Sequence, residues 1–197
     1  LLSQIIRGRA LSLQEASVMD IDEDAFRHDV VKARRYGYLN VPAENQYMQG
    51  MKEGGVTTEE IILHDIAIYI TEIMEDDVMY FVGSGSTPRA VMDVLQLEST
   101  LLGIDAVCNR QLVAKDINER DMLQLISAHP AKIVLTVIGG QGHLFGRGNQ
   151  PFSPAVIRAV GKENLLIIAT PGKIHALHGS PIRVDTGDTD LDHELYG

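Results

Sequence analysis

Apolar positions recur along the chain with two different periods, which divide the sequence into two parts. Residues 11–21 and 30–41 mix or alternate apolar and polar side chains, which is typical of strands with one exposed face. From Thr57 onward, short apolar runs alternate with segments in which apolar residues recur at helical spacing. We therefore expect a small β element within residues 1–55, after the end of a helix over residues 1–7, and an α/β domain over residues 56–197.

The second part predicts strands that alternate with helices. The expected strands cover residues 78–82, 100–107, 112–114, 132–138, 165–169 and 182–184. The expected helices cover residues 57–75, 88–95, 118–128, 155–160 and 174–177. Strands separated by helix-length connections form a mostly parallel, doubly wound, Rossmann-like sheet. Ligands of such sheets bind beyond the carboxyl ends of the strands, where the strand order reverses.

The composition excludes several classes of protein. Asp and Glu outnumber Lys and Arg by 27 to 17, giving a net charge of −10, which argues against a nucleic-acid partner because phosphate backbones require a basic face. Cys108 is the single cysteine, so an internal disulfide is excluded and a reducing cytoplasm fits best. Charged residues interrupt the most apolar helical stretch, residues 61–74, so we expect no membrane span.

The chain begins with an apolar helical pattern and without methionine. Chain termini are usually polar and frayed. We therefore interpret the sequence as a piece of a longer polypeptide.

A loop of small residues follows the strand expected at 78–82 and is the first candidate ligand site. Its glycines allow close backbone approach, its hydroxyls are possible hydrogen-bond partners, and Pro88 is expected to open a helix whose free amides face the ligand. A simple helix cap is the structural alternative. The candidate binding residues here are Gly83, Ser84, Gly85, Ser86, Thr87 and Arg89.

A second candidate site is the stretch Lys132–Gln150, in which a buried strand runs into a loop with five glycines in ten residues. Such a density of glycine implies tight turns or close approach of the backbone to a ligand. Ser153 is expected to cap the following helix, with Pro154 at its first position. A buried strand, a glycine loop with a cation and a helix N-terminus together favour an anionic ligand. The candidate residues are Gly139, Gly140, Gln141, Gly142, Arg147, Asn149 and Gln150.

Five further polar residues are expected at strand ends. Asp105 would end the strand over 100–107, although an exposed turn carboxylate explains it equally well. Thr170 would cap a helix, and Lys173 would reach a phosphate. Asp185 and Asp188 follow the last strand and could hold Mg²⁺ or a ribose diol, but an N-cap and turn is at least as good an explanation. The histidines show no shared metal spacing, and no residue of this chain is assigned as catalytic.

Five segments of the chain resemble one known family when they are taken together. They are VGSGSTPRAVMDVL, LLGIDAV, IGGQGHLFGRGNQPFSPAVIRAVG, IIATPGKIHAL and RVDTGD. These segments are similar to the C-terminal part of the ATP-NAD kinase family, in the branch that includes the acetoin-catabolism protein X-like proteins. The resemblance implies phosphoryl transfer from ATP or polyphosphate to the 2′-hydroxyl of the adenosine ribose of NAD, with Mg²⁺ as cofactor, and a homo-oligomer.

The chain departs from that family in one respect. Its members have a catalytic aspartate in a Gly-Gly-Asp-Gly-Thr motif in an N-terminal domain, and this sequence has no such motif. The resemblance therefore implies a nucleotide-binding portion whose general base and Mg²⁺ ligands come from a missing N-terminal domain of the same polypeptide. Two other functions stay open: a sugar-phosphate isomerase or phosphosugar-binding protein, and a nucleotide-sensing domain without catalysis.

Overall fold

The computed structural model describes residues 13–21, 33–42, 56–138, 142–146 and 149–196. By contacts, the chain splits into two compact units, Leu1–Lys52 and Glu53–Gly197. In the first unit, β1 (Leu13–Ile21) pairs antiparallel with β2 (Ala33–Pro42), and the register shifts at Val18/Met19. The helix predicted over residues 1–7 and the loop predicted over 43–55 lie outside the described residues.

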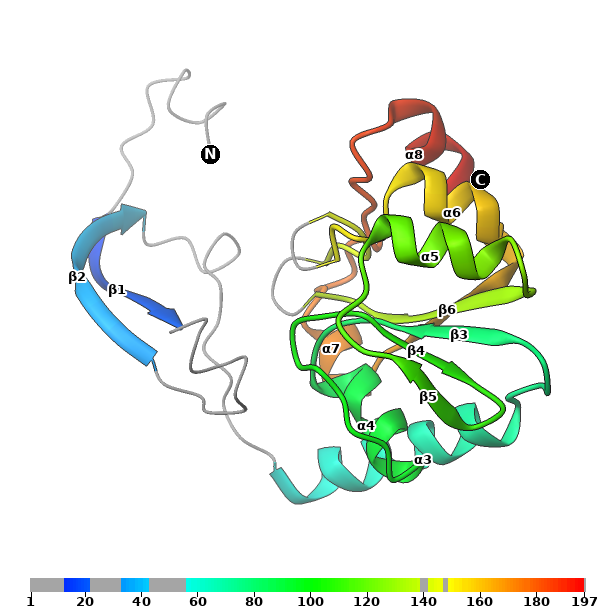
Figure 1. Cartoon of the computed structure of the whole chain (residues 1–197). Helices are drawn as coiled ribbons and strands as arrows, with labels where there is room; N and C mark the ends of the chain where they lie inside the picture. Colours follow the sequence, from blue (N-terminus) through cyan, green and yellow to red (C-terminus); the bar gives the residue numbers. More distant parts are fainter. Residues whose placement is uncertain (1–12, 22–32, 43–55, 139–141, 147–148, 197) are drawn as a thin grey trace. The chain divides into compact units, whose positions relative to one another are not determined.

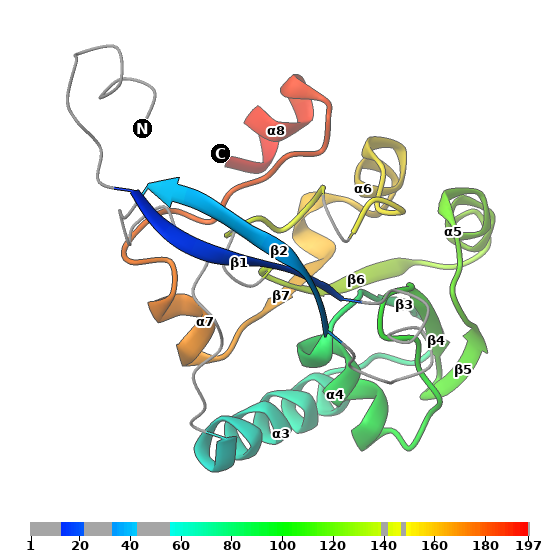
Figure 2. The same ribbon diagram turned by 90° about the vertical axis from the view of Figure 1, so that its left-hand side faces the viewer.

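Five strands of the second unit form one sheet, with the order β5-β4-β3-β6-β7 among the described residues (Figures 1 and 2). The parallel part consists of β3 (Met79–Val82), β6 (Ala131–Thr136) and β7 (Leu165–Ile168). On the other side of β3, β4 (Asp105–Cys108) and β5 (Gln111–Ala114) are antiparallel. The unit is thus an α/β fold with a mixed sheet whose parallel strands include its centre.

The antiparallel hairpin β4–β5 follows from its turn. Asn109 and Arg110 both have positive φ, 52° and 58°, between the paired residues Cys108 and Gln111. Two successive residues with positive φ give the type I′ turn, whose twist matches that of a two-residue hairpin. The side chain of Asn109 also accepts a hydrogen bond from the backbone N–H of Asp77 at 2.7 Å, which fixes the hairpin beside the start of β3.

Helices cover both faces of this sheet. In Figure 1, α5 (Glu119–Ile126), α6 (Pro154–Val160) and α8 (Thr189–Tyr196) lie above it. Below it lie α3 (Val56–Glu72), α4 (Ser86–Val94) and α7 (Pro171–His175). A short 3₁₀ turn, Lys162–Asn164, connects α6 to β7.

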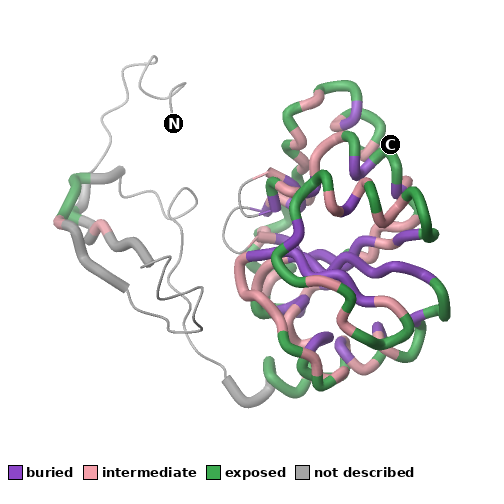
Figure 3. The backbone as a smooth tube through the Cα atoms, viewed as in Figure 1, coloured by how far each residue is buried: buried purple, intermediate pink, exposed green. Residues whose placement is uncertain are grey.

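The central strands β4, β3 and β6 are almost entirely buried (Figure 3), whereas the edge strands β5 and β7 are partly exposed. Along β3, Met79 and Phe81 belong to the core beneath α5 and α6, whereas Tyr80 and Val82 belong to the core against α3 and α4. This alternation explains the short, unbroken apolar run, because both faces of a covered strand need apolar side chains.

Several predicted boundaries were wrong. Helix α3 begins at Val56, one residue before the expected start, and ends at Glu72 rather than at residue 75. Helix α4 begins at Ser86, so Pro88 is its third residue and not its first. The expected strand over 182–184 is only an isolated bridge between Arg183 and His143, and α8 was not predicted. The predicted cap of α6, Ser153, is confirmed, whereas Asn118, expected as the first residue of a helix, is the N-cap of α5.

Candidate functional site

The strand order reverses between β3 and β6. From β3 the chain proceeds outward to β4 and β5, and it then returns to the other side of β3 to form β6 and β7. In open α/β sheets a ligand binds at such a reversal, outside the carboxyl ends of the strands. The loop after β3 (residues 83–85) and the residues after β6 (Val137 and Ile138) therefore define the candidate crevice.

The loop after β3 presents the N-terminus of α4 to this crevice. Gly85 is the N-cap, with φ of 102°, and as a glycine it has no side chain with which to cap the helix. The N–H of Gly85 donates to the carbonyl of Leu101 at 2.9 Å, which fixes the loop. The first amides of a helix have no partner within the helix and lie at the positive end of its dipole. Because the N-cap residue supplies no side-chain acceptor to these amides, they can bind an anion.

Lys173 of α7 brings a positive charge to the same place. Its Nζ donates to Thr136 Oγ1 at 2.9 Å and to the carbonyl of Val137 at 3.3 Å, at the end of β6. Thr136 is buried, and its Cγ2 lies 3.9 Å from the position that a Cβ on Gly85 would occupy. The ammonium group and the uncapped helix N-terminus therefore lie on neighbouring sides of one small region.

The position of Lys173 depends on the start of α7. Thr170 is the N-cap, as predicted, and its Oγ1 accepts a hydrogen bond from the backbone N–H of Lys173 at 3.4 Å. The same hydroxyl donates to Glu59 Oε1 of α3 at 2.8 Å. Glu59 was not expected here, and no sequence signal could have indicated it, because it lies 111 residues away from Thr170.

Asn149 joins the two glycine-rich loops that the sequence singled out. Its Oδ1 accepts from Ser84 Oγ at 2.9 Å, and its Nδ2 donates to the carbonyl of Leu144 at 3.0 Å. A Cβ on Gly83 would lie 3.2 Å from the carbonyl of Val134, so this glycine permits the close packing. With 1% of its surface exposed, Asn149 is a scaffold residue that holds the loops together.

Asp105 begins β4, whereas the sequence suggested that it ends a strand. Because β4 is antiparallel to β3, Asp105 is paired with Val82 and still lies at the edge of the sheet where the crevice is. Its carboxylate accepts hydrogen bonds from the N–H and Oγ1 of Thr100 at 2.6 and 2.8 Å and from the N–H of Asp116 at 3.1 Å. These bonds give it a structural role.

The segment after α7 runs beside the end of the second loop. Arg183 forms a parallel bridge with His143, in which the N–H of Arg183 donates to Gly142 O at 2.7 Å and that of Leu144 to Arg183 O at 2.9 Å. Gly146, with φ of 97°, packs on the backbone of the exposed Asp185. Arg183 was not predicted as a site residue, because the sequence placed it within an expected strand over residues 182–184 and not in a loop at a strand end.

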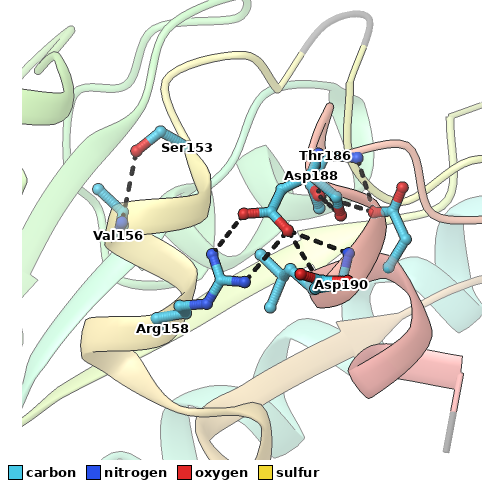
Figure 4. Close-up of polar contacts among 8 residues, drawn as sticks. Ser153, Val156, Arg158, Thr186, Asp188 and Asp190 are labelled. Atoms are coloured by element: carbon cyan, nitrogen blue, oxygen red, sulfur yellow. Dashed lines mark hydrogen bonds and ion pairs between the residues drawn. The ribbon is translucent and has the colours of Figure 1, made fainter.

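Asp188 caps α8 instead of facing the crevice (Figure 4). Its carboxylate accepts from the N–H groups of Asp190 and Leu191 at 3.1 and 3.0 Å and forms two hydrogen bonds with Arg158 at 2.7 and 3.1 Å. The Arg158 guanidinium, followed by the Leu191 amide, lowers the pKa of Asp188 to about 2. The cap interpretation of this residue therefore holds. The described part of the chain contains no group of three His, Cys, Asp or Glu side chains that could hold a metal ion.

The remaining predicted residues are less informative. Ser86 and Gln150 are exposed, Thr87 is buried, and Arg89 is 3.9 Å from Asp93 on the same helix. Gly139, Gly140, Gln141 and Arg147 lie outside the described residues.

An open pocket of about 400 Å³ lies at the other end of the strands, near the starts of β3 and β6. It is lined by residues 126–132, Val78, the end of α6 and Asn164. Lys132 at its rim pairs with Glu75, and this hydrogen bond raises the pKa of Lys132. The pocket is far from the reversal of strand order, and the cation and uncapped helix of the crevice are better suited to an anionic ligand.

One comparison with known proteins gave a match. The model of the family described as ATP-NAD kinase C-terminal domain matches residues 75–197, which is more than half of the chain. No curated protein and no solved structure matched. None of the described helices is long and apolar enough to cross a membrane.

Proposed function

The chain belongs to the family of ATP-NAD kinase C-terminal domains, and we propose that residues 53–197 are the nucleotide-binding part of a kinase that phosphorylates NAD. The phosphoryl donor is ATP or polyphosphate, and the acceptor is the 2′-hydroxyl of the adenosine ribose. The family match supports an NAD kinase-like function, and the crevice supplies the physical reason for nucleotide binding.

The observation on which the proposal rests is the proximity of Lys173 to the uncapped N-terminus of α4. Both features bind anions, and phosphoryl transfer is catalysed mainly by positioning and electrostatic stabilisation of phosphate groups. In the proposed complex, a phosphate accepts hydrogen bonds from the first amides of α4, and the Lys173 ammonium turns toward it from Thr136. Asn149 and Thr170 hold the backbone and the lysine in place.

The described residues do not fit a Mg²⁺ site. Mg²⁺ prefers carboxylate oxygens and water, but the carboxylates of Asp105 and Asp188 are bonded to their own surroundings. We therefore assign no metal-dependent step to the described residues. The proposal places the general base and the metal ligands in a further domain of the polypeptide, because the Gly-Gly-Asp-Gly-Thr motif is absent from this sequence.

Titration calorimetry with ADP and NAD tests the proposal, with Lys173→Ala as the variant. A charge-assisted hydrogen bond contributes about 1.5–3 kcal/mol, so the variant should bind about 10- to 100-fold more weakly. Lys115→Ala is the matched control. It also removes one positive charge, but Lys115 pairs with Glu98 on the surface, away from the crevice. Absence of nucleotide binding by the unaltered chain, or equal affinity of the Lys173 variant, would contradict the proposed function.

A phosphosugar isomerase is the second candidate. The same cradle, an uncapped helix N-terminus after a Gly-Ser-Gly-Ser-Thr loop, suits a single phosphomonoester as well. Incubation with ribose 5-phosphate distinguishes the two functions, because turnover of the sugar phosphate would favour the isomerase over the kinase.

A further inference from the structure

Two basic side chains, which the proposed cradle does not use, lie next to each other at the end of the sheet. The parallel bridge between His143 and Arg183 is formed by backbone hydrogen bonds on both sides of Arg183. Residues paired in this way point their side chains to the same face, with backbones about 4.8 Å apart. The imidazole and the guanidinium are therefore neighbours.

The face of the sheet toward which the His143 and Arg183 side chains point follows from their neighbours along the chain. Ile182 and Val184 pack against the core beneath α5 and α6, and Leu144 is buried in the same core. Because side chains alternate along an extended segment, Arg183 and His143 point away from that core. Thr136, which lies between the core residues Leu135 and Val137, also points away from it, toward Lys173. Both pairs of groups thus face the same side of the sheet.

The His143–Arg183 pair lies a short distance from the Lys173 ammonium group. The N–H of Ile138 donates to the carbonyl of His143 at 2.8 Å, and Ile138 is two residues, or about 7 Å, beyond Thr136 along the strand direction. From the other direction, Leu177 lies about one helical turn after Lys173, and a Cβ on Gly142 would be 3.0 Å from its Cδ2. Arg183 is therefore on the order of 10 Å from the Lys173 ammonium, and two long side chains can close part of this gap.

The pair is accessible and positively charged. Arg183 is exposed and His143 half-buried, and neither forms an ion pair or side-chain hydrogen bond within the described part of the molecule. Asp185 lies on the same side two residues later but makes no ion pair with Arg183 in the described structure. An arginine binds phosphate through two parallel N–H groups, and its charge does not depend on pH.

We propose that His143 and Arg183 form a second phosphate subsite, so that the crevice selects ligands with at least two linked phosphates. The α4 N-terminus and Lys173 bind one phosphate, and the Arg183 guanidinium with the His143 imidazole binds the next. The ligand class is a nucleoside di- or triphosphate or a dinucleotide with a diphosphate bridge. This inference rests on the proposed function, because it assigns the ligand class of the same crevice.

Calorimetry with AMP, ADP and NAD on the full chain separates the two subsites. Arg183→Ala should weaken ADP and NAD binding about tenfold, equivalent to about 1.4 kcal/mol, and leave AMP affinity unchanged. Lys173→Ala should weaken all three. His143→Ala should reduce ADP affinity about threefold, the effect of one ordinary hydrogen bond. Because the bridge is made by backbone atoms, these variants keep their fold, which circular dichroism and thermal melting can verify.

Arg120→Ala is the control, since Arg120 is an exposed residue of α5 on the opposite face of the sheet. Equal loss in this variant and in Arg183→Ala would show a long-range charge effect and overturn the subsite. Unchanged ADP affinity in Arg183→Ala, or an equal loss of AMP and ADP affinity, would also overturn it while leaving the proposed function intact. If the unaltered chain binds no nucleotide, both proposals fail.

Discussion

Replacing Asn149 by alanine should destabilise the second unit more than most single polar substitutions. The side chain is 1% exposed and makes two hydrogen bonds, one to Ser84 and one to the carbonyl of Leu144. Each bond contributes about 1 kcal/mol net, and a buried carbonyl that loses its donor costs about 1–3 kcal/mol more. We expect a loss of about 3 kcal/mol in the free energy of unfolding.

Asn149→Asp provides the comparison, because the carboxylate has nearly the same shape as the amide. It cannot donate to the Leu144 carbonyl, and it places a charge where the side chain is buried. We expect a loss at least as large as for alanine. Ser84→Ala removes the first hydrogen bond but leaves the bond to the Leu144 carbonyl, and should cost less than Asn149→Ala, about 1 kcal/mol.

The assay is urea denaturation followed by circular dichroism, with thermal melting in parallel. A loss of about 3 kcal/mol corresponds to a melting temperature lower by about 6–12 °C for a chain of this size. A loss below about 1 kcal/mol for Asn149→Ala, with an unchanged denaturant slope, would refute the reasoning. It would mean that packing, rather than the amide, holds the two loops together.

Two further predictions concern the supports of the crevice and of α8. The Asp188 pKa is lowered from 3.8 to about 2, so the stabilisation is fully present above the unfolded value and is lost as pH falls through the folded value. The melting temperature of the native chain should therefore exceed that of Arg158→Met at neutral pH, with the gap shrinking between about pH 4 and pH 2; a constant gap would contradict this. Gly103→Ala would place a Cβ 2.7 Å from Thr100 Oγ1 and even closer to Asp116, both partners of Asp105, and should cost about 1–3 kcal/mol by overpacking. The control Gly179→Ala has open space and should cost only about 1 kcal/mol for its φ of 77°; equal losses would refute the role of Gly103.

The sequence was sufficient to predict the parallel part of the fold. Residues 79–82 and 133–135 are apolar without interruption, which is typical of strands covered on both faces. Caps at Ser153 and Thr170 could be predicted because each uses local hydrogen bonds to backbone amides. The antiparallel direction of β4 could not, since it depends on tertiary pairing with Val82 and on a turn of two non-glycine residues with positive φ.

The candidate site was only partly accessible to prediction. Lys173 and the loop over 83–87 were selected from local pattern, and the structure brings them together through Thr136. Glu59 and Arg183 were missed because their positions result from contacts between segments distant in sequence. Asp105 and Asn149 were selected for their chemistry, but that chemistry serves the scaffold, a distinction that depends on burial and on hydrogen-bond partners.

The charged side chains discussed above differ in what they can do for a ligand: the carboxylates serve the scaffold, whereas the cations can bind phosphate. The carboxylates of Asp105, Glu59 and Asp188 accept hydrogen bonds from Thr100, Thr170 and Arg158, which tie them to their own surroundings. A phosphotransferase needs a positioned group that accepts the hydroxyl proton. By contrast, Lys173 and Arg183 place positive charge at the end of β6 in a chain with a net charge of −10. In the described part of the molecule the crevice is therefore suited to hold phosphates.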